Sequence, residues 1–192
     1  MVYNIGMRVI TGKYKGRKLV APKNDTRPTL DRAKETLFNM LGDLNGAKVL
    51  DLFAGSGQIA LECLSRGADC AVMCDSGKDA QAAIVANFKQ LGQQPQLFRC
   101  DYMQCLRALG GQKFDLVYLD PPYKSDVYVS ATQAILDGDM LADGGTIVCE
   151  HSVDVVLGEG FCGLCLEKSR KVGTVMFSFY KRQSDVVAKE QL

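Results

Sequence analysis

Short, continuous apolar runs alternate along most of this chain with longer segments in which apolar residues recur at helical spacing. Such short runs are typical of buried strands, and recurrence every three or four positions is typical of helices with one buried face. Strands that alternate with helices indicate a parallel sheet covered on both sides, so the predicted fold is α/β and doubly wound. The predicted strands cover residues 49–53, 70–75, 96–101, 114–120 and 144–151, and the predicted helices cover 58–67, 78–92, 103–109 and 127–136.

The N-terminal residues do not follow this alternation. Two short β-type runs, 7–11 and 17–21, flank a glycine-containing turn, which predicts a β-hairpin. Residues 30–41 again show apolar positions at helical spacing and predict a helix. We therefore expect an N-terminal extension over residues 1–42 that consists of a small hairpin and a helix.

The C-terminal residues also break the alternation. Residues 165–182 contain two β-type runs joined around 171–173, which indicates an antiparallel hairpin at the edge of an otherwise parallel sheet. The main domain is expected to cover 43–183, and a short tail is expected over 184–192.

Charge is distributed unevenly along the 192 residues, although the formal net charge is only +1. Residues 1–35 contain nine Lys or Arg against three Asp or Glu, a net charge of +6, whereas the remainder has 14 basic and 19 acidic residues, a net charge of −5. A basic head on an acidic body favours a polyanionic partner, and the alternative is a solvated basic surface. No apolar run is long enough for a membrane helix and no signal-peptide plan is present, so a cytoplasmic protein is expected.

The eight cysteines are expected to be free thiols, because a cytoplasmic chain of this size is not held together by disulfides. Cys162 and Cys165 form a CxxC pair, but the chain has one histidine and no second CxxC. We expect no metal site.

The segment VLDLFAGSGQIAL joins the first predicted strand of the main domain to the helix after it. Its glycines permit a tight turn and close approach of a ligand to a helix N-terminus. Gly55 to Ala60 also fits the G-x-G-x-x-G/A dinucleotide pattern, and Asp75 follows about 20 residues on. Asp51, however, would repel a pyrophosphate and would suit the amino group of a cationic ligand.

Acidic residues follow three successive strands, and each suits one part of a nucleoside ligand. Asp75 can bind a ribose diol, and Asp101 can accept a hydrogen bond from an adenine amino group. Together with Asp51 they favour S-adenosyl-L-methionine over NAD. The expected cofactor-binding residues are Asp51, Phe53, Ala54, Gly55, Ser56, Gly57, Asp75, Ser76, Asp101 and Tyr102.

The segment DLVYLDPPY ends another apolar strand on an acid, two prolines and a ring. Pro121 and Pro122 have fixed φ and no N–H, and Asp120 is held extended by the proline after it. This stiff corner offers a carboxylate, free carbonyls and the ring of Tyr123, and thus a small polar pocket.

The motifs DLFAGSG and DPPY resemble those of class I methyltransferases, which have a Rossmann-like fold. The order and spacing of MRVITGKYKGRKL, TRPTLDRAKETLFNML, VLDLFAGSGQIALECLSRGA and DPPY are similar to the RsmD family over nearly the whole chain. The resemblance implies transfer of a methyl group from S-adenosyl-L-methionine to the exocyclic N2 amino group of a guanine in 16S ribosomal RNA. Two departures are Lys34, where arginine is common, and Asp75, where glutamate is common.

The chemistry implied by the resemblance assigns a role to each residue of the stiff corner. The carboxylate of Asp120 and the carbonyl of Pro121 would hold the two N–H bonds of the target amino group, Pro122 would fix the corner, and Tyr123 would stack on the extruded base. The expected RNA-binding residues are Arg8, Lys13, Lys15, Arg17, Lys18, Arg27 and Arg32.

The expected partner is 16S rRNA or an assembly intermediate of the small ribosomal subunit, bound by a monomer. Other functions stay open. DPPY is shared with adenine-specific methyltransferases, although the chain has no separate target-recognition domain. The glycine pattern alone would permit an NAD-dependent oxidoreductase, and a non-catalytic RNA-binding assembly factor could keep the same fold.

Overall fold

The computed structural model describes residues 7–22, 31–122 and 125–187. Within these residues, no helix is both long and apolar enough to cross a bilayer.

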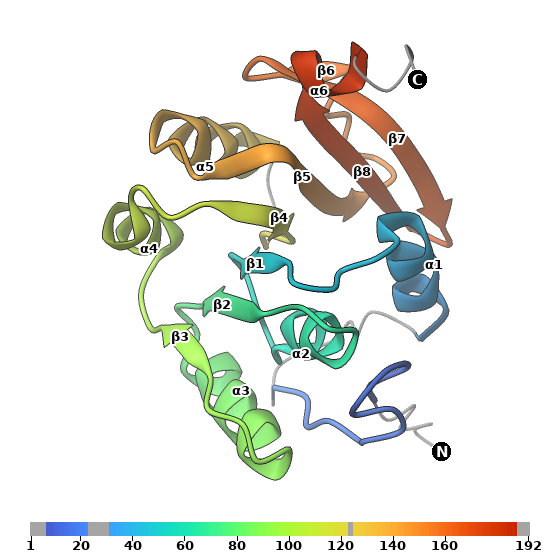
Figure 1. Ribbon diagram of the computed structural model, residues 1–192, viewed down its shortest axis with the longest axis vertical. Helices are drawn as coiled ribbons and strands as arrows, with labels where there is room; N and C mark the ends of the chain where they lie inside the picture. Colours follow the sequence, from blue (N-terminus) through green and yellow to red (C-terminus); the bar gives the residue numbers. More distant parts are fainter. Residues whose placement is uncertain (1–6, 23–30, 123–124, 188–192) are drawn as a thin grey trace.

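A single eight-stranded sheet forms the centre of the molecule, with strand order β3-β2-β1-β4-β5-β8-β7-β6 (Figure 1). The strands β3, β2, β1, β4 and β5 are parallel, and β8, β7 and β6 continue the sheet in antiparallel pairing. The prediction of a mostly parallel sheet with an antiparallel C-terminal hairpin is confirmed. The strands are β1 Lys48–Asp51, β2 Cys70–Cys74, β3 Gln96–Phe98, β4 Phe114–Leu119, β5 Leu141–Ser152, β6 Gly160–Phe161, β7 Leu164–Val172 and β8 Val175–Arg182.

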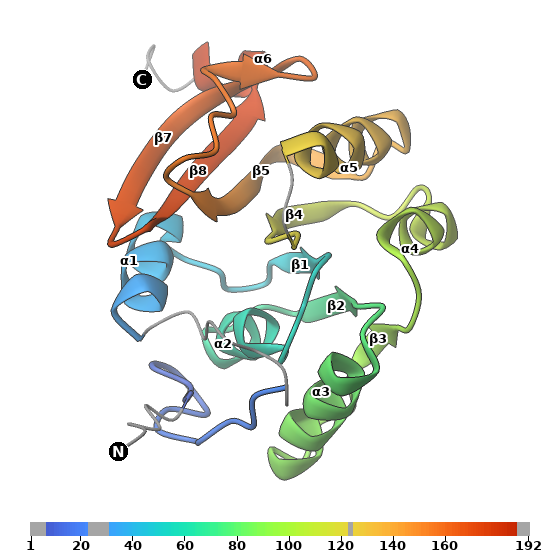
Figure 2. The ribbon, with the colours of Figure 1, turned by 180° about the vertical axis from the view of Figure 1, so that it is seen from behind.

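Helices cover both faces of this sheet, as the two opposite views in Figures 1 and 2 show. One face packs under α1, α2 and α3, and the other under α4 and α5, so the buried residues form two apolar clusters, one on each side. Each predicted helix is present, with boundaries that shift by a few residues. The helices are α1 Asp31–Leu41, α2 Gln58–Ser65, α3 Lys78–Gln90, α4 Tyr102–Leu109, α5 Ser125–Asp137 and α6 Gln183–Val187.

Several strands differ from the sequence prediction: β1 ends at Asp51 in place of residue 53, and β5 begins at Leu141 in place of residue 144. β3 ends at Phe98, short of the predicted residue 101, because the Asp101 side chain accepts hydrogen bonds from two amides of the first turn of α4 and so begins that helix. The two-residue strand β6 was not predicted, since so short a pairing leaves no periodic signal.

The described N-terminal residues 7–22, here called the N-terminal arm, reverse direction as predicted but form only one antiparallel bridge, Arg8 to Lys18. Longer strands do not form because other backbone groups of the arm bond to the helices beneath it. The amides of Ile10 and Thr11 donate to the carboxylate of Glu62 in α2 at 2.7 and 3.0 Å. Met7, Val9 and Leu19 of the arm are buried in the cluster that also contains residues of α1, α2 and α3.

Candidate active site

Acidic residues gather at one edge of the sheet because the parallel strands end there. Asp51 is the last residue of β1, Asp75 follows β2, and Asp120 follows β4. The strand order changes direction between β1 and β4, and in open α/β sheets the crevice at such a reversal is the usual place for a ligand.

Asp51 is the most unusual of these acids. Its side chain is only 1 % exposed, and its Oδ2 atom has no hydrogen-bond partner within the described structure. Burial, with the nearby charge of Asp75, raises the pKa of the Asp51 carboxyl to about 7, although the backbone N–H of Ala60 opposes this shift. A cationic group placed against Oδ2 would satisfy the atom and stabilise the charged form.

The glycine loop after β1 is folded as its sequence suggests. Gly55 and Gly57 both have positive φ, 55° and 75°. A Cβ atom at Gly57 would meet side chains of Ile84 and Met73 at 3.3 Å, whereas one at Gly55 would meet nothing within 4 Å. Gly57 therefore packs the loop closely against α3 and β2, whereas the side of Gly55 that would carry a Cβ atom faces open space.

Asp75 holds the glycine loop in place and can also accept hydrogen bonds from a ligand. Its two carboxylate oxygens accept from the backbone N–H groups of Gly55 and Gly77, both at 2.8 Å. Each oxygen keeps a second lone pair, so the carboxylate retains capacity to accept from two hydroxyl groups.

Asp101 and two aromatic rings form the next part of the site. One carboxylate oxygen of Asp101 accepts from the amides of Met103 and Gln104, which orients the carboxylate at the start of α4. The half-buried rings of Phe53 and Tyr102 lie side by side, with centroids 5.5 Å apart and planes tilted by 48°. Between the glycine loop and α4, the chain thus presents apolar ring faces beside an acid.

Three other residues were predicted to bind the cofactor, namely Ala54, Ser56 and Ser76, and the structure places them in different surroundings. The Ala54 amide donates to the carbonyl of Cys74 and closes the loop onto β2. The Ser56 side chain is buried, and its hydroxyl contacts the Met7 sulfur at 3.7 Å, so it faces the N-terminal arm. Ser76 is exposed beside Asp75.

The segment after β4 lies next to the Asp51 strand. Asp120 and Pro122 are exposed and Pro121 is buried, while Tyr123 lies outside the described residues. Tyr118, two residues before Asp120, is buried and donates its hydroxyl to the Glu150 carboxylate.

Two residues that pack behind the segment after β4, Tyr128 and Glu150, were missed by the sequence analysis. The Tyr128 hydroxyl of α5 donates to the Glu150 carbonyl at 2.5 Å. Burial raises the pKa of Tyr118 and of Tyr128, with further contributions from the charges of Glu150 and Asp120. Glu150 lies near the end of the fifth parallel strand, so the pattern that identified the other strand-end acids would have found it.

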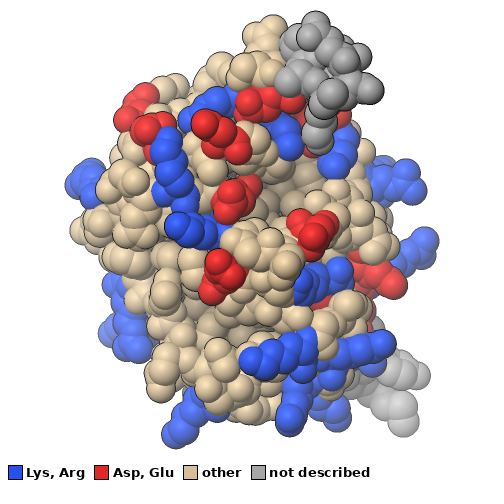
Figure 3. All heavy atoms as spheres, viewed as in Figure 1, with Lys and Arg blue, Asp and Glu red and all other residues tan. Residues whose placement is uncertain are grey.

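The predicted RNA-binding side chains that the structure describes, Arg8, Lys13, Lys15, Arg17, Lys18 and Arg32, are all exposed. Figure 3 shows Lys and Arg side chains gathered over the part of the surface where the arm lies in Figure 1. Arg8 also pairs with Asp31 at 2.8 Å, which partly neutralises its charge. Arg27 lies outside the described residues.

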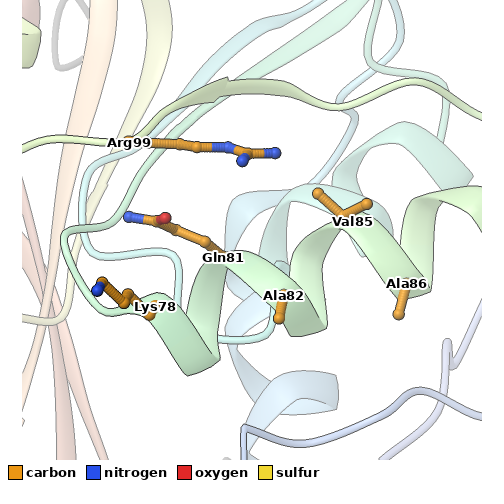
Figure 4. A pocket seen from close by; sticks show the side chains of 6 residues that line it. All are labelled: Lys78, Gln81, Ala82, Val85, Ala86 and Arg99. Carbon is orange, nitrogen blue, oxygen red and sulfur yellow. The ribbon is translucent and has the colours of Figure 1, made fainter.

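Two open pockets lie beside the arm and beside α3; Gln81, which lines the second, donates to the Asp75 carbonyl at 2.9 Å. One, of about 330 Å³, lies between the arm and α1 and is lined by residues that include Arg8, Lys15 and Asp31. The other, of about 390 Å³, lies between α3 and the residues after β3, where Arg99 extends over Gln81 and Val85 of the helix (Figure 4). The second pocket contains no acidic residue, so it does not suit the cationic ligand that Asp51 requires.

The sheet order and the glycine loop facing acidic strand ends define a class I methyltransferase fold. A solved structure described as "Putative methyltransferase yhhF from Escherichia coli" superposes with a TM-score of 0.80 at 31% identity, covering 92% of this chain and 98% of that chain. Residues 7–181 match the family described as "Conserved hypothetical protein 95".

Two curated relatives align with this chain over nearly the full length of both proteins. The Bacillus subtilis protein named "Putative rRNA methyltransferase YlbH" is 37% identical over 183 residues, which are 92% of this chain and 100% of the relative. The Escherichia coli K12 protein named "Ribosomal RNA small subunit methyltransferase D" is 32% identical over 181 residues, 93% of this chain and 91% of the relative. The chain belongs to this family, the RsmD family that its sequence motifs resemble.

Proposed function

We propose that this protein transfers a methyl group from S-adenosyl-L-methionine to the exocyclic N2 amino group of a guanine in 16S ribosomal RNA. The observation that carries the proposal is the buried Asp51 carboxylate on the strand next to the Asp120-Pro121-Pro122 corner. Its Oδ2 atom has no hydrogen-bond partner within residues 7–22, 31–122 and 125–187. The names of the curated relatives support an rRNA substrate. The proposed substrate is 16S rRNA or a small-subunit assembly intermediate, and a cytoplasmic monomer suffices because one chain supplies every group of the site.

The residues at the strand ends fit the cofactor part by part. Asp51 would pair with its ammonium group, and the open side of Gly55 would admit its amino-acid portion. Asp75 would accept from the ribose hydroxyls and Asp101 from the adenine amino group, with Phe53 and Tyr102 beside the adenine. When bound, the cofactor supplies a methyl group activated by a positively charged sulfur.

Dinucleotide binding is a poorer fit for the same loop. A pyrophosphate close to Gly55 and Gly57 would lie near the buried carboxyl of Asp51, where desolvation strengthens repulsion between like charges. Ionised Asp51 would thus oppose NAD and attract a cation.

The corner after β4 supplies the groups that the chemistry needs. The lone pair of an exocyclic amino group is delocalised into the base, so the nitrogen must become more tetrahedral before it reacts. The Asp120 carboxylate and the Pro121 carbonyl would accept from its two N–H bonds and hold that geometry. As positive charge develops on the nitrogen, Asp120 would stabilise it, and the proton would then leave to solvent.

The exposed cations of the arm would bind the RNA backbone, because phosphate contacts position an RNA without reading its sequence. The target base must leave its stack to reach Asp120, and Tyr123 would stack on it.

Calorimetry with S-adenosyl-L-methionine and with NAD, followed by mass spectrometry of 16S rRNA incubated with enzyme and cofactor, tests the proposal. We expect binding of the first ligand only and one added methyl group on a guanine N2. Binding of NAD instead would favour an oxidoreductase. A methyl group on adenine would show an adenine methyltransferase, and cofactor binding without any methylated product would favour an assembly factor.

A further inference from the structure

The glycine loop and the N-terminal arm are joined by one buried side chain, Asn87 of α3. This residue is fully buried. Its Oδ1 atom accepts from the Val20 amide at 2.7 Å, and its Nδ2 group donates to the Val20 carbonyl at 3.0 Å and to the Ser56 carbonyl at 2.9 Å. Both Nδ2 hydrogens are therefore used, one on the arm and one on the loop.

A second contact connects the same loop residue to the other end of the arm. The Ser56 hydroxyl contacts the Met7 sulfur at 3.7 Å, and the Met7 carbonyl accepts from the Leu19 amide at 2.7 Å. Ser56 is thus tied to both ends of the arm, directly at Met7 and through Asn87 at Val20.

The turn in the middle of the arm is fixed independently of the loop. The Lys13 amide donates to the Ser65 carbonyl and the Tyr14 amide to the Ser65 hydroxyl, at the C-terminal end of α2. Together with the bonds to Glu62, these contacts hold the turn that presents the arm's cations. The arm is therefore anchored at its turn on α2 and near its ends on Asn87 and Ser56, and of these partners only Ser56 belongs to the glycine loop.

We propose that Asn87 is a positioning residue that couples the glycine loop to the N-terminal arm, so that cofactor binding and RNA binding strengthen each other. The inference rests on the proposed function, because it takes the loop as the cofactor site and the arm as the RNA contact. A cofactor that orders the loop fixes the Ser56 carbonyl and, through the Asn87 amide, both backbone groups of Val20. Reciprocity then requires that RNA bound on the arm tightens the cofactor by the same factor.

Asn87→Ala tests the coupling, and Gln90→Ala is its matched control. Gln90 lies one turn further along α3 and donates to the Lys18 carbonyl at 3.0 Å, an arm contact with no link to the loop. The dissociation constant of S-adenosyl-L-methionine is measured with and without a 16S rRNA transcript. We expect RNA to tighten the cofactor by about fivefold or more in the wild type and in Gln90→Ala, a typical coupling. In Asn87→Ala the factor should be clearly smaller, because only the Ser56–Met7 contact still joins the loop to the arm.

Hydrogen exchange of the unaltered protein gives an answer even where Asn87→Ala does not fold. Saturating S-adenosyl-L-methionine should slow exchange of the glycine-loop amides and also of the Val20 amide. Protection of the loop without protection of Val20, or unchanged coupling in a folded Asn87→Ala variant, would overturn the inference and leave the proposed function intact. Absence of any cofactor binding would overturn both.

Discussion

Asp51 and Tyr118 lie directly opposite each other in the parallel pairing of β1 with β4. Paired positions on neighbouring strands place side chains on the same face of a sheet, so the buried Asp51 carboxyl and the tyrosine share one layer. Tyr118 precedes Asp120 by two residues. The pairing therefore brings the proposed cofactor-binding acid close to the proposed catalytic one, although they are far apart in sequence.

Asp120→Asn should abolish methyl transfer while leaving cofactor affinity nearly unchanged. The amide cannot stabilise developing positive charge on the target nitrogen, so we expect a rate loss on the order of a hundredfold or more. Single-turnover methylation and calorimetry measure the two quantities. Asp115→Asn is the control, since Asp115 lies near the opposite end of β4 and accepts from the Lys48 amide. Unchanged turnover in Asp120→Asn would remove this residue from the mechanism.

Asp51→Asn should stabilise the protein above neutral pH in the absence of cofactor. Burial raises the Asp51 pKa from 3.8 to about 7, so between these values the unfolded chain loses its proton before the folded chain does. Stability contributed by this group is therefore lost as the pH rises through that window. We expect the variant to melt on the order of a few degrees higher than wild type at pH 8, and close to it at pH 4.

Asp69→Asn is the control for that comparison, since Asp69 is exposed and its substitution removes a negative charge from the surface and none from the interior. Cofactor affinity should change with pH in the opposite direction to stability. Wild type should bind S-adenosyl-L-methionine more tightly at pH 8 than at pH 6, because ionised Asp51 attracts the ammonium group. Asp51→Asn should bind weakly at both values. A pH-independent affinity in the wild type would argue against the assigned pairing.

Reversing the charge of Arg17 and Lys18 together to Glu should weaken RNA binding without changing cofactor affinity in the absence of RNA. Loss of two phosphate contacts should also make the dependence on salt shallower by about 1 to 2 in log–log slope. Filter binding over a salt series measures both. Lys48→Glu with Arg107→Glu makes the same change of charge at two exposed residues outside the arm. Equal effects from the two pairs would indicate a non-specific response to charge.

Gly12→Ala should detach the turn of the arm and weaken RNA binding, whereas Gly16→Ala should not. Both glycines have φ near +80°, so each alanine carries a strain of about 1–2 kcal/mol. Only at Gly12 would the new Cβ collide with the Ser65 carbonyl oxygen, at 1.7 Å, while nothing lies within 4 Å at Gly16. Thermal melts and RNA affinities are measured for both variants. Gly16→Ala reports the effect of backbone strain alone, and the additional loss in Gly12→Ala reports the effect of the collision with Ser65.

Much of the fold could be predicted because its signals are local. The alternation of apolar runs with helical spacing gave the order of elements, and an acid directly after a strand, as at Asp75 or Asp120, is visible in the sequence. Residues such as Asn87 and Glu62 gave no such signal. Each is a polar residue in a helix, and its role depends on backbone groups of the arm that are more than fifty positions away, Val20 for Asn87 and Ile10 for Glu62.

By itself, the sequence determined the doubly wound architecture, the glycine loop, the acids at the strand ends and the basic N-terminal arm, since these follow from residue type and spacing along the chain. Only the tertiary structure decided that Asp51 Oδ2 has no hydrogen-bond partner among the described residues, that Ser56 faces the arm, and that the arm bonds to helices in place of a full hairpin. The reason is physical: burial and the partners of a polar group are set by segments distant in sequence, which meet only when the chain folds.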